Sequence, residues 1–235
     1  MFLRTLALWA LGLPLTAFIF LVIMATSVFD RNARAIHSLV ALWARLILLI
    51  SGVSVRVEGM ENIPTGTPVV FLSNHQGAFD IPVLQGFIPV QFRWVAKKSL
   101  FSVPLIGWSM RFAGYIAIDR DNAAEALKSM EAAASRIRNG TSVLIFPEGT
   151  RSDTGKLLPF KRGGFMLAAK SGAPIVPVAV SGTNVIMTRG GLSIRPASVR
   201  VSFGRPIETS GAEDKYLRNR TKEAIEALFT KIKGV

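Results

Sequence analysis

The sequence predicts an α/β protein with a mixed, largely parallel sheet flanked by helices, preceded by an N-terminal hydrophobic helical hairpin. Beyond residue 52, short apolar runs alternate with segments of helical periodicity, a pattern typical of parallel sheets covered by helices. Before that point the chain holds two long apolar stretches, and the mean hydropathy of the whole chain is +0.39. The 235 residues therefore divide into a membrane-anchoring segment, 1–52, and a main domain, 53–235.

The hairpin is predicted from two apolar stretches of different length. Leu6–Phe29 contains no charged residue and exceeds the roughly 20 residues that cross a bilayer. Pro14 is expected to kink or split this helix. Ser38–Ile50 is shorter and contains Arg45, so it favours an interfacial helix whose arginine reaches the lipid headgroups. The alternative is a pair of core helices in a soluble domain.

The charges around the first stretch predict its orientation. Arg4 precedes it, whereas Arg31 and Arg34 follow it. Positive residues remain on the cytoplasmic side, so we expect an inner, cytoplasmic membrane location with the main domain in the cytoplasm. Whether the first helix spans the bilayer or enters one leaflet is left open.

The main domain contains alternating strand and helix signals, and its last helix has an amphipathic stripe that would close the fold. The predicted strands are Val53–Val57, Val69–Leu72, Arg93–Ala96, Tyr115–Ile118, Ser142–Phe146, Ile175–Val180 and Val199–Phe203. The predicted helices are Asp80–Phe87, Pro104–Phe112, Ala123–Arg138, Gly164–Ser171 and Glu213–Ile232.

A histidine and an aspartate lie at the first polar corner, after the strand Val69–Leu72. His75 is one of two histidines in the chain, and Asp80 follows five positions later. On one helix these side chains would lie about 140° apart, but a strand–turn–helix corner can bring them together. A carboxylate on one imidazole nitrogen leaves the other free to act as a base. The alternative is that Asp80 only caps the following helix.

Three further stretches are richer in polar groups than a scaffold requires. Gly114–Arg120 is a strand that ends in an acid–base pair, alternatively a surface ion pair of little energy. Phe146–Ser152 follows a buried strand and places Arg151 beside glycine and hydroxyl groups, close to a helix start. This arrangement suits a phosphate, although an ordinary solvated turn is the alternative. Ile175–Thr183 is a buried strand in which Pro177 indicates an irregular or edge position.

These stretches, in this order, resemble the motifs of the glycerolipid acyltransferases, specifically the lysophosphatidate (1-acylglycerol-3-phosphate) acyltransferases. Asn74–Asp80 matches the His-x4-Asp motif, and Phe146–Ser152 matches the Phe-Pro-Glu-Gly-Thr-Arg-Ser motif. Gly114–Arg120 and Ile175–Val178 match the second and fourth motifs, and Lys97–Trp108 is also similar. The resemblance runs from about residue 59 to residue 204, with mild departures at positions 76 and 117.

The resemblance implies an acyltransferase catalytic domain over 53–235. It implies transfer of a fatty acyl group from acyl-CoA or acyl carrier protein to the 2-hydroxyl of lysophosphatidate, which makes phosphatidate for phospholipid synthesis. His75, steered by Asp80, would be the general base. The residues that it implies for substrate binding are Arg151, Glu148, Gly149, Thr150, Arg120 and Lys97. The three cations would hold the acceptor phosphate, and Glu148 would order an arginine or the glycerol backbone.

The implied reaction requires no cofactor and no metal, because the acyl thioester is a co-substrate. No covalent intermediate is required either, and the chain has no cysteine nucleophile. Backbone N–H groups near Gly77 or Gly149 are candidate oxyanion donors. The expected partners are membrane phospholipid, lysophosphatidate and the acyl donor.

Other function classes were weighed against this one. Another lysophospholipid, a lyso-aminolipid or glycerol 3-phosphate are alternative acceptors. A non-catalytic basic membrane adaptor would fit the net charge of +13, but an adaptor does not need both His75 and Asp80. A nucleic-acid binder is disfavoured because the basic residues are dispersed and lack interleaved aromatic residues. The spacing from Gly149 to Lys156 does not fit a P-loop.

Overall fold

The structure, a computed structural model, describes residues 2–119, 123–152 and 154–233. Its strands are β1 Ser54–Glu58, β2 Val70–Ser73, β3 Phe92–Lys97, β4 Ile116–Ile118, β5 Ser142–Ile145, β6 Ile175–Ser181 and β7 Ser198–Phe203. Its α-helices are α1 Phe2–Ala7, α2 Leu13–Ser27, α3 Arg34–Ser51, α4 Asp80–Phe87, α5 Ile106–Phe112, α6 Ala123–Arg138, α7 Gly163–Ser171 and α8 Asp214–Lys233. Short π or 3₁₀ segments are η1 Leu8–Gly12, η2 Met60–Asn62 and η3 Lys98–Ser102.

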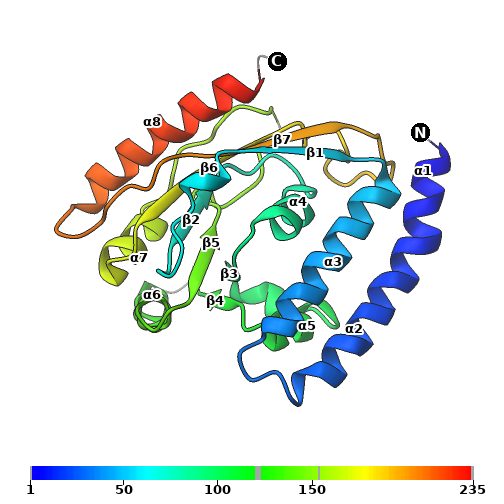
Figure 1. The fold of residues 1–235 in the computed structure, drawn as a ribbon, viewed down its shortest axis with the longest axis horizontal. Helices are drawn as coiled ribbons and strands as arrows, with labels where there is room; N and C mark the ends of the chain where they lie inside the picture. The colour runs from blue at the N-terminus through cyan, green and yellow to red at the C-terminus, as the bar shows by residue number, and fades with distance from the viewer. Residues whose placement is uncertain (1, 120–122, 153, 234–235) are drawn as a thin grey trace.

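In the described part of the chain the strands form one seven-stranded sheet in the order β1-β7-β6-β2-β5-β3-β4 (Figure 1). Neighbouring strands are parallel except β6 and β7, which are antiparallel. The predicted fold class is thus confirmed, and each predicted strand and helix of the main domain is present with its ends shifted by two residues or fewer.

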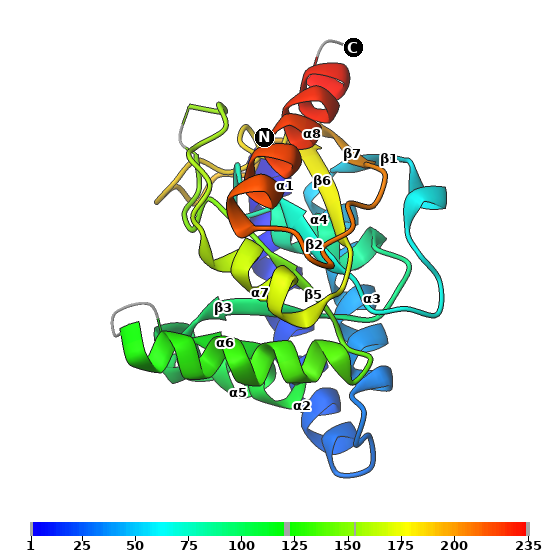
Figure 2. The same ribbon diagram turned by 90° about the vertical axis from the view of Figure 1, so that its left-hand side faces the viewer.

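The core lies on both faces of the sheet because side chains alternate along each strand. Phe71 points toward the face covered by α3 and α4, whereas its neighbours Val70 and Leu72 point toward α6, α7 and α8. Figure 2 looks onto α6 and α7, with the sheet and the N-terminal helices behind them. The central strands are buried on both faces and therefore have nearly continuous apolar sequences.

The N-terminal hairpin is present, and its first arm is helical from Phe2 to Ser27. Pro14 does not split this helix. The π-helical segment just before it changes the hydrogen-bonding pattern where proline has no N–H to donate. Thr16 Oγ donates to the carbonyl oxygen of Gly12 (2.6 Å) and accepts from the indole N–H of Trp43 on α3 (2.9 Å), which joins the two arms.

The second arm, α3, starts earlier than the sequence predicts and packs along α4. Its start is fixed by Asp30, whose carboxylate accepts the backbone N–H groups of Arg34 (3.0 Å) and Ile36 (2.9 Å). The Nε–H of Arg45 donates to the carbonyl oxygen of Gly86 on α4 (2.7 Å), while the residue remains exposed. Contact of Arg45 with lipid headgroups stays a prediction.

Candidate active site

The parallel strands bring the polar stretches of the sequence to one edge of the sheet. β2 lies between β5 and β6 and is parallel to both, so the loops that leave their carboxyl ends are neighbours. The loop after β2 carries His75, the loop after β5 carries residues 146–152, and Thr183 follows β6. Sequence segments more than 70 residues apart thereby meet at one site, and hydrogen bonds link them directly.

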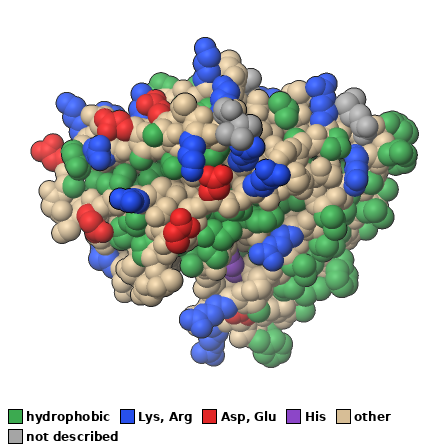
Figure 3. Space-filling view, turned by 45° about the horizontal axis from the view of Figure 1, so that its top comes forward, with side chains coloured by type: hydrophobic (Ala, Val, Ile, Leu, Met, Phe, Trp, Pro, Cys, Tyr) green, Lys and Arg blue, Asp and Glu red, His purple; other side chains and the backbone are tan. Residues whose placement is uncertain are grey.

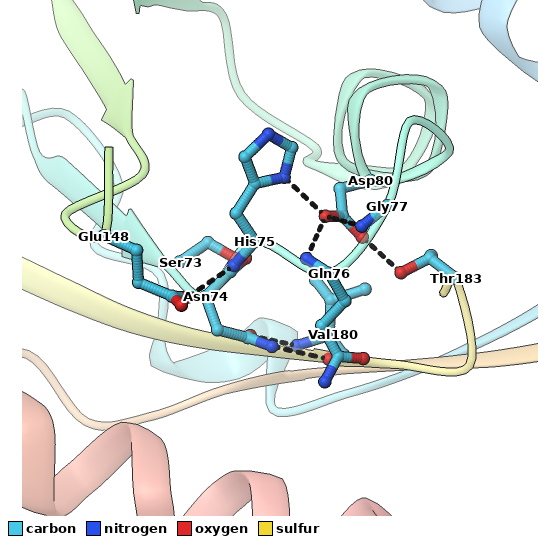
Figure 4. A network of polar contacts seen from close by, with 9 residues as sticks. All are labelled: Ser73, Asn74, His75, Gln76, Gly77, Asp80, Glu148, Val180 and Thr183. Atoms are coloured by element: carbon cyan, nitrogen blue, oxygen red, sulfur yellow. Dashed lines mark hydrogen bonds and ion pairs between the residues drawn. The ribbon is translucent and has the colours of Figure 1, made fainter. Parts of the chain in front are cut away.

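His75 and Asp80 form the predicted pair. The ring Nδ1 of His75 lies 2.6 Å from Oδ2 of Asp80. The carboxylate is fully buried, whereas 13% of the histidine side chain is exposed. Figure 4 shows that the other ring nitrogen, Nε2, points away from Asp80. Because the carboxylate accepts the Nδ1 proton, Nε2 carries the free lone pair and is the atom that can accept a proton from a substrate.

Asp80 is held by more than its histidine. Oδ2 also accepts the backbone N–H groups of Gln76 (2.6 Å) and Gly77 (2.9 Å), and Oδ1 accepts the hydroxyl of Thr183 (Figure 4). The alternative that Asp80 only caps α4 does not describe these contacts, because its carboxylate reaches back into the loop that precedes the helix. Asp80 thus fixes both the histidine ring and the backbone that carries it.

The loop after β5 fixes His75 from its other side. The ring of Phe146 stacks on the imidazole, with 3.8 Å between centroids and an interplanar angle of 6°. The backbone N–H of His75 donates to Oε1 of Glu148 (2.7 Å), and its carbonyl oxygen accepts the N–H of Ser152 (2.8 Å). Both the main chain and the ring plane of His75 are therefore set before a substrate arrives.

Glu148 joins two loops in this structure. Only 2% of the residue is exposed, and its second carboxylate oxygen accepts the N–H of Leu158 (2.8 Å). Burial raises the pKa of the Glu148 carboxyl, while the hydrogen bonds from His75 and Leu158 oppose that rise. Its contacts are to backbone groups, and a direct contact of Glu148 with substrate stays a prediction.

The turn at residues 147–151 presents polar groups to solvent beside His75. Gly149 has a φ of +72°, and a Cβ there would lie 3.2 Å from the side chain of Lys161, so the site requires glycine. The backbone N–H of Lys161 donates to the carbonyl oxygen of Pro147 (2.8 Å), which fixes the two segments together. Thr150 and Arg151 are exposed on the same turn.

Of the remaining predicted cations, Lys97 lies farther along the same edge. Lys97 ends β3, the second strand from β2, and strands are spaced by about 4.8 Å, so its backbone is about 10 Å to the side. The next residue, Lys98, forms an ion pair with Asp119 at 3.1 Å. Arg120 lies outside the described residues.

The predicted oxyanion donors are already engaged. The N–H of Gly77 donates to Asp80, and that of Gly149 donates to the carbonyl oxygen of Phe146 (3.1 Å). Within the described ranges, His, Asp and Glu side chains do not gather in a group of three that could hold a metal ion.

Sequence reasoning gave no role in the site to Thr183, Phe146 or Lys161. The sequence predicts Phe146 at the end of a strand and at the start of the Phe-Pro-Glu-Gly-Thr-Arg-Ser motif, without a contact to His75. Thr183 stands directly after a buried strand, where a hydroxyl is a possible signal, but its meeting with Asp80 depends on β6 being the neighbour of β2.

Comparisons with known proteins bear on the fold and the family of this chain. The sequence model of the family described as Acyltransferase matches residues 54–181, which is more than half of the chain and includes the loops after β2 and β5. A solved structure, the 1-acyl-sn-glycerophosphate (LPA) acyltransferase PlsC from Thermotoga maritima, superposes with a TM-score of 0.86 at 26% identity. The superposition covers 100% of this chain and 96% of that one.

Curated relatives carry matching names. The chloroplast 1-acyl-sn-glycerol-3-phosphate acyltransferase of Brassica napus is 36% identical over 206 residues, which cover 84% of this chain and 59% of the relative. The enzyme of the same name from Pseudomonas aeruginosa is 33% identical over 185 residues, covering 78% of this chain and 70% of the relative. The chain spans less than two thirds of the plant relatives, 59% and 55% for the first two. The motif resemblance is confirmed, and the chain belongs to the acyltransferase family.

Proposed function

We propose that this protein transfers a fatty acyl group from an acyl thioester to the 2-hydroxyl of lysophosphatidate and so makes phosphatidate. One observation carries the proposal: the His75–Asp80 pair is fixed at the sheet edge with Nε2 free, beside a turn suited to a phosphate. The relatives are named for this acceptor, and the Thermotoga enzyme shares the whole fold.

The chemistry needs one base and one acid, and His75 supplies both in turn. Nε2 removes the proton of the 2-hydroxyl as the oxygen attacks the thioester carbonyl. When the tetrahedral intermediate collapses, the carbon–sulfur bond breaks and the thiolate leaves. The imidazolium then returns the proton to the sulfur. Asp80 stabilises the imidazolium during this cycle, and neither residue is covalently changed.

Binding of the acceptor phosphate falls to the turn beside His75. Arg151 offers a planar fork that matches two phosphate oxygens, and Thr150 adds a hydroxyl donor. Lys161 approaches the same turn and adds a second cation. Lys97, at the end of β3, and Arg120, outside the described residues, stay predictions as phosphate ligands. A phosphate fixed here would present the nearby hydroxyl to Nε2, which lowers the entropic part of the barrier.

The donor is acyl-CoA or acyl carrier protein, both of them anionic, and the net charge of +13 attracts either. The acceptor and the product belong to the membrane. Two helices, Phe2–Ser27 and Arg34–Ser51, are long and apolar enough to cross a bilayer by length and composition. We infer that the hairpin holds the enzyme at the cytoplasmic face of the inner membrane, where it meets its acceptor.

One assay tests the proposal directly. Purified protein is given lysophosphatidate, other lysophospholipids, a lyso-aminolipid or glycerol 3-phosphate, each with acyl-CoA and with acyl carrier protein as donor. Thiol release and lipid product are measured together. Among the acceptors, lysophosphatidate should give the highest kcat/KM. With lysophosphatidate as acceptor, the kcat/KM for acyl-CoA and the kcat/KM for the acylated carrier protein show which donor the enzyme prefers. A higher kcat/KM for an uncharged lyso-acceptor would show that lysophosphatidate is not the preferred substrate.

The matched variants are His75→Ala and Asp80→Asn, with the folded state checked by circular dichroism. Loss of a positioned general base costs about 10²–10⁴-fold in rate, so His75→Ala should lose nearly all turnover. Asp80→Asn keeps the shape of the side chain but favours the wrong tautomer, and its rate should also fall strongly. Normal turnover by folded His75→Ala would refute the mechanism, whereas absence of turnover by the wild type on every acceptor would favour the non-catalytic adaptor.

A further inference from the structure

The segment 98–112, which joins β3 to β4 and contains η3 and α5, exposes apolar side chains to an unusual degree. Their exposed fractions range from 36% for Phe112 to 57% for Ile106. The exposed set is Leu100, Val103, Leu105, Ile106, Trp108 and Phe112. Six large apolar side chains in fifteen residues form a patch rather than scattered single exposures.

The backbone of this segment is strained in a way that keeps the patch on the outside. Leu105 has a φ of +63°, a conformation that a branched apolar residue rarely adopts. Two residues later, a Cβ on Gly107 would lie 2.1 Å from the carbonyl oxygen of Phe101, so the chain folds back tightly on itself. Leu105 and Ile106 are more than half exposed at this turn. Contact with water does not offset the cost of the strained backbone.

The patch continues the lipid-suited surface of the hairpin. α5 packs against α2, and the rings of Trp108 and Phe20 lie 6.3 Å apart. On α2 itself Leu13, Phe18 and Leu21 are more than half exposed. Figure 1 places α5 beside α2, and Figure 3 shows hydrophobic side chains gathered on the side where the N-terminal helices lie.

Cations border this surface. Arg111 lies on α5 three residues after Trp108 and is exposed, as are Arg31 and Arg34 in and beside the turn between α2 and α3. An apolar patch with an indole and a basic rim fits a phospholipid bilayer, whose acyl chains take the apolar groups and whose headgroups take the aromatic and basic ones. A protein partner would not explain the continuity with an apolar helix long enough to cross a membrane.

We propose that the segment 98–112 is a second membrane-contact surface, which enters the headgroup and upper acyl region of an anionic bilayer alongside the hairpin. It begins directly after Lys97, at the edge of the sheet that carries His75. A bilayer seated here therefore meets the active-site edge itself. An effect of this membrane contact on the reaction rate rests on the proposed function, because the contact brings the active site to its acceptor only if that acceptor is a membrane lipid.

The chain has no cysteine, so single introduced cysteines can report the environment of each site. Ile106→Cys tests the segment, Phe18→Cys on α2 is the reference, and Leu127→Cys is the control. Leu127 is also about half exposed but lies on α6, on the other face of the sheet. Each variant is labelled with an environment-sensitive fluorophore and reconstituted into phosphatidylcholine–phosphatidylglycerol vesicles, with nitroxide-bearing acyl chains or iodide in water as quenchers.

We expect the labels at 106 and 18 to shift to shorter wavelength and to be quenched by the nitroxide lipid, and the label at 127 to be quenched by iodide. A label at 106 that iodide quenches as strongly as the one at 127 would overturn the proposal. So would a label at 106 that neither quencher reaches, since that would indicate a second copy of the chain on this surface.

A second measurement gives the catalytic consequence. Ile106→Asp should lower the rate on bilayer-resident lysophosphatidate about tenfold or more, because a charge replaces a lipid-buried side chain. The rate on a short-chain, water-soluble acceptor should be unchanged, and Leu127→Asp should match wild type on both. Equal loss on both acceptors would overturn a membrane role. If the wild type uses neither acceptor, the proposed function fails, while the labelling result still decides the membrane contact.

Discussion

Asp80 is a buried charge whose cost is met by close partners. Its two carboxylate oxygens accept from the His75 ring, two backbone N–H groups and the Thr183 hydroxyl. If one of these donors is removed, the other hydrogen bonds remain, but the carboxylate is free to tilt. A hydrogen bond to a charged group contributes about 1.5–3 kcal/mol. The donor that the sequence motif does not contain, Thr183, offers the cleanest single-residue test.

We predict that Thr183→Val lowers kcat about 10- to 100-fold, which corresponds to the loss of one such hydrogen bond. Valine keeps the volume and removes the hydroxyl, so KM for lysophosphatidate should change little. Thr183→Ser retains the hydroxyl and should retain most of kcat. Steady-state kinetics of the three proteins provide the measurement. Equal kcat for the valine and serine variants would show that the hydroxyl has no positioning role.

Arg151 is an exposed cation on the loop after β5, the loop that contacts His75 through Phe146 and Glu148. We predict that Arg151→Ala raises KM for lysophosphatidate far more than KM for the acyl donor, and that Arg151→Lys recovers only part, because a point charge replaces a bidentate fork. Arg220→Ala, on the exposed side of α8, is the matched control and should behave as wild type. A change confined to the donor KM would assign Arg151 to the thioester side.

Among the helices, α3 is part of both the N-terminal hairpin and the core of the main domain. Its outer side continues the apolar hairpin, and its inner side packs on α4 with Ile47 and Leu48 in the main core. Polar groups reinforce the contact, since Arg45 donates to Gly86 and the amide of Gln85 lies 3.4 Å from the ring of His37. The predicted boundary after residue 52 therefore crosses a shared core.

We expect two truncations to separate these roles. A chain beginning at Arg34 keeps α3 and should remain folded in detergent. A chain beginning at Val53 also loses the burial of Ile47 and Leu48, about 3–6 kcal/mol, a large part of the 5–15 kcal/mol that stabilises a typical domain. Thermal unfolding followed by circular dichroism gives the comparison. A similar Tm for both chains would support the boundary after residue 52 as a true domain boundary.

At the scale of the whole molecule, charge is unevenly compensated. Most ion pairs among the described residues lie on the face of the sheet covered by α6, α7 and α8, where Glu131 pairs with Arg138 and Lys170, and Asp214 pairs with Arg162. The hairpin side has Arg31, Arg34 and Arg111 at its exposed margin. From this distribution of charge we expect attraction to anionic membranes through the side that is also apolar.

We therefore predict that the protein associates faster with phosphatidylglycerol-containing vesicles than with pure phosphatidylcholine, measured by flotation after dilution from detergent. Raising salt from about 0.1 M to about 1 M shortens the screening length from about 10 Å to about 3 Å, and should remove most of this difference. Binding to neutral vesicles serves as the control, since burial of apolar helices does not weaken with salt. Equal rates on both vesicle types at low salt would contradict the prediction.

The order and type of the elements could be read from the sequence. Strand periodicity after residue 52 predicted each strand of the sheet, because strands buried on both faces must be short apolar runs. Polar residues at strand ends, above all His75 and the turn at Arg151, predicted where polar side chains gather in the candidate site. These patterns depend on residues that are close together in the chain, so they can be recognised without knowledge of the tertiary structure.

Only the tertiary structure decided which strands are neighbours, and with that the partners of each side chain. Thr183 reaches Asp80 because β6 adjoins β2, and Phe146 stacks on His75 because β5 adjoins it on the other side. Arg45 donates to the carbonyl oxygen of Gly86 for the same kind of reason, since α3 packs along α4. Contacts between distant segments depend on sheet order and helix packing, which are set by the whole core and not by the residues beside them in the chain.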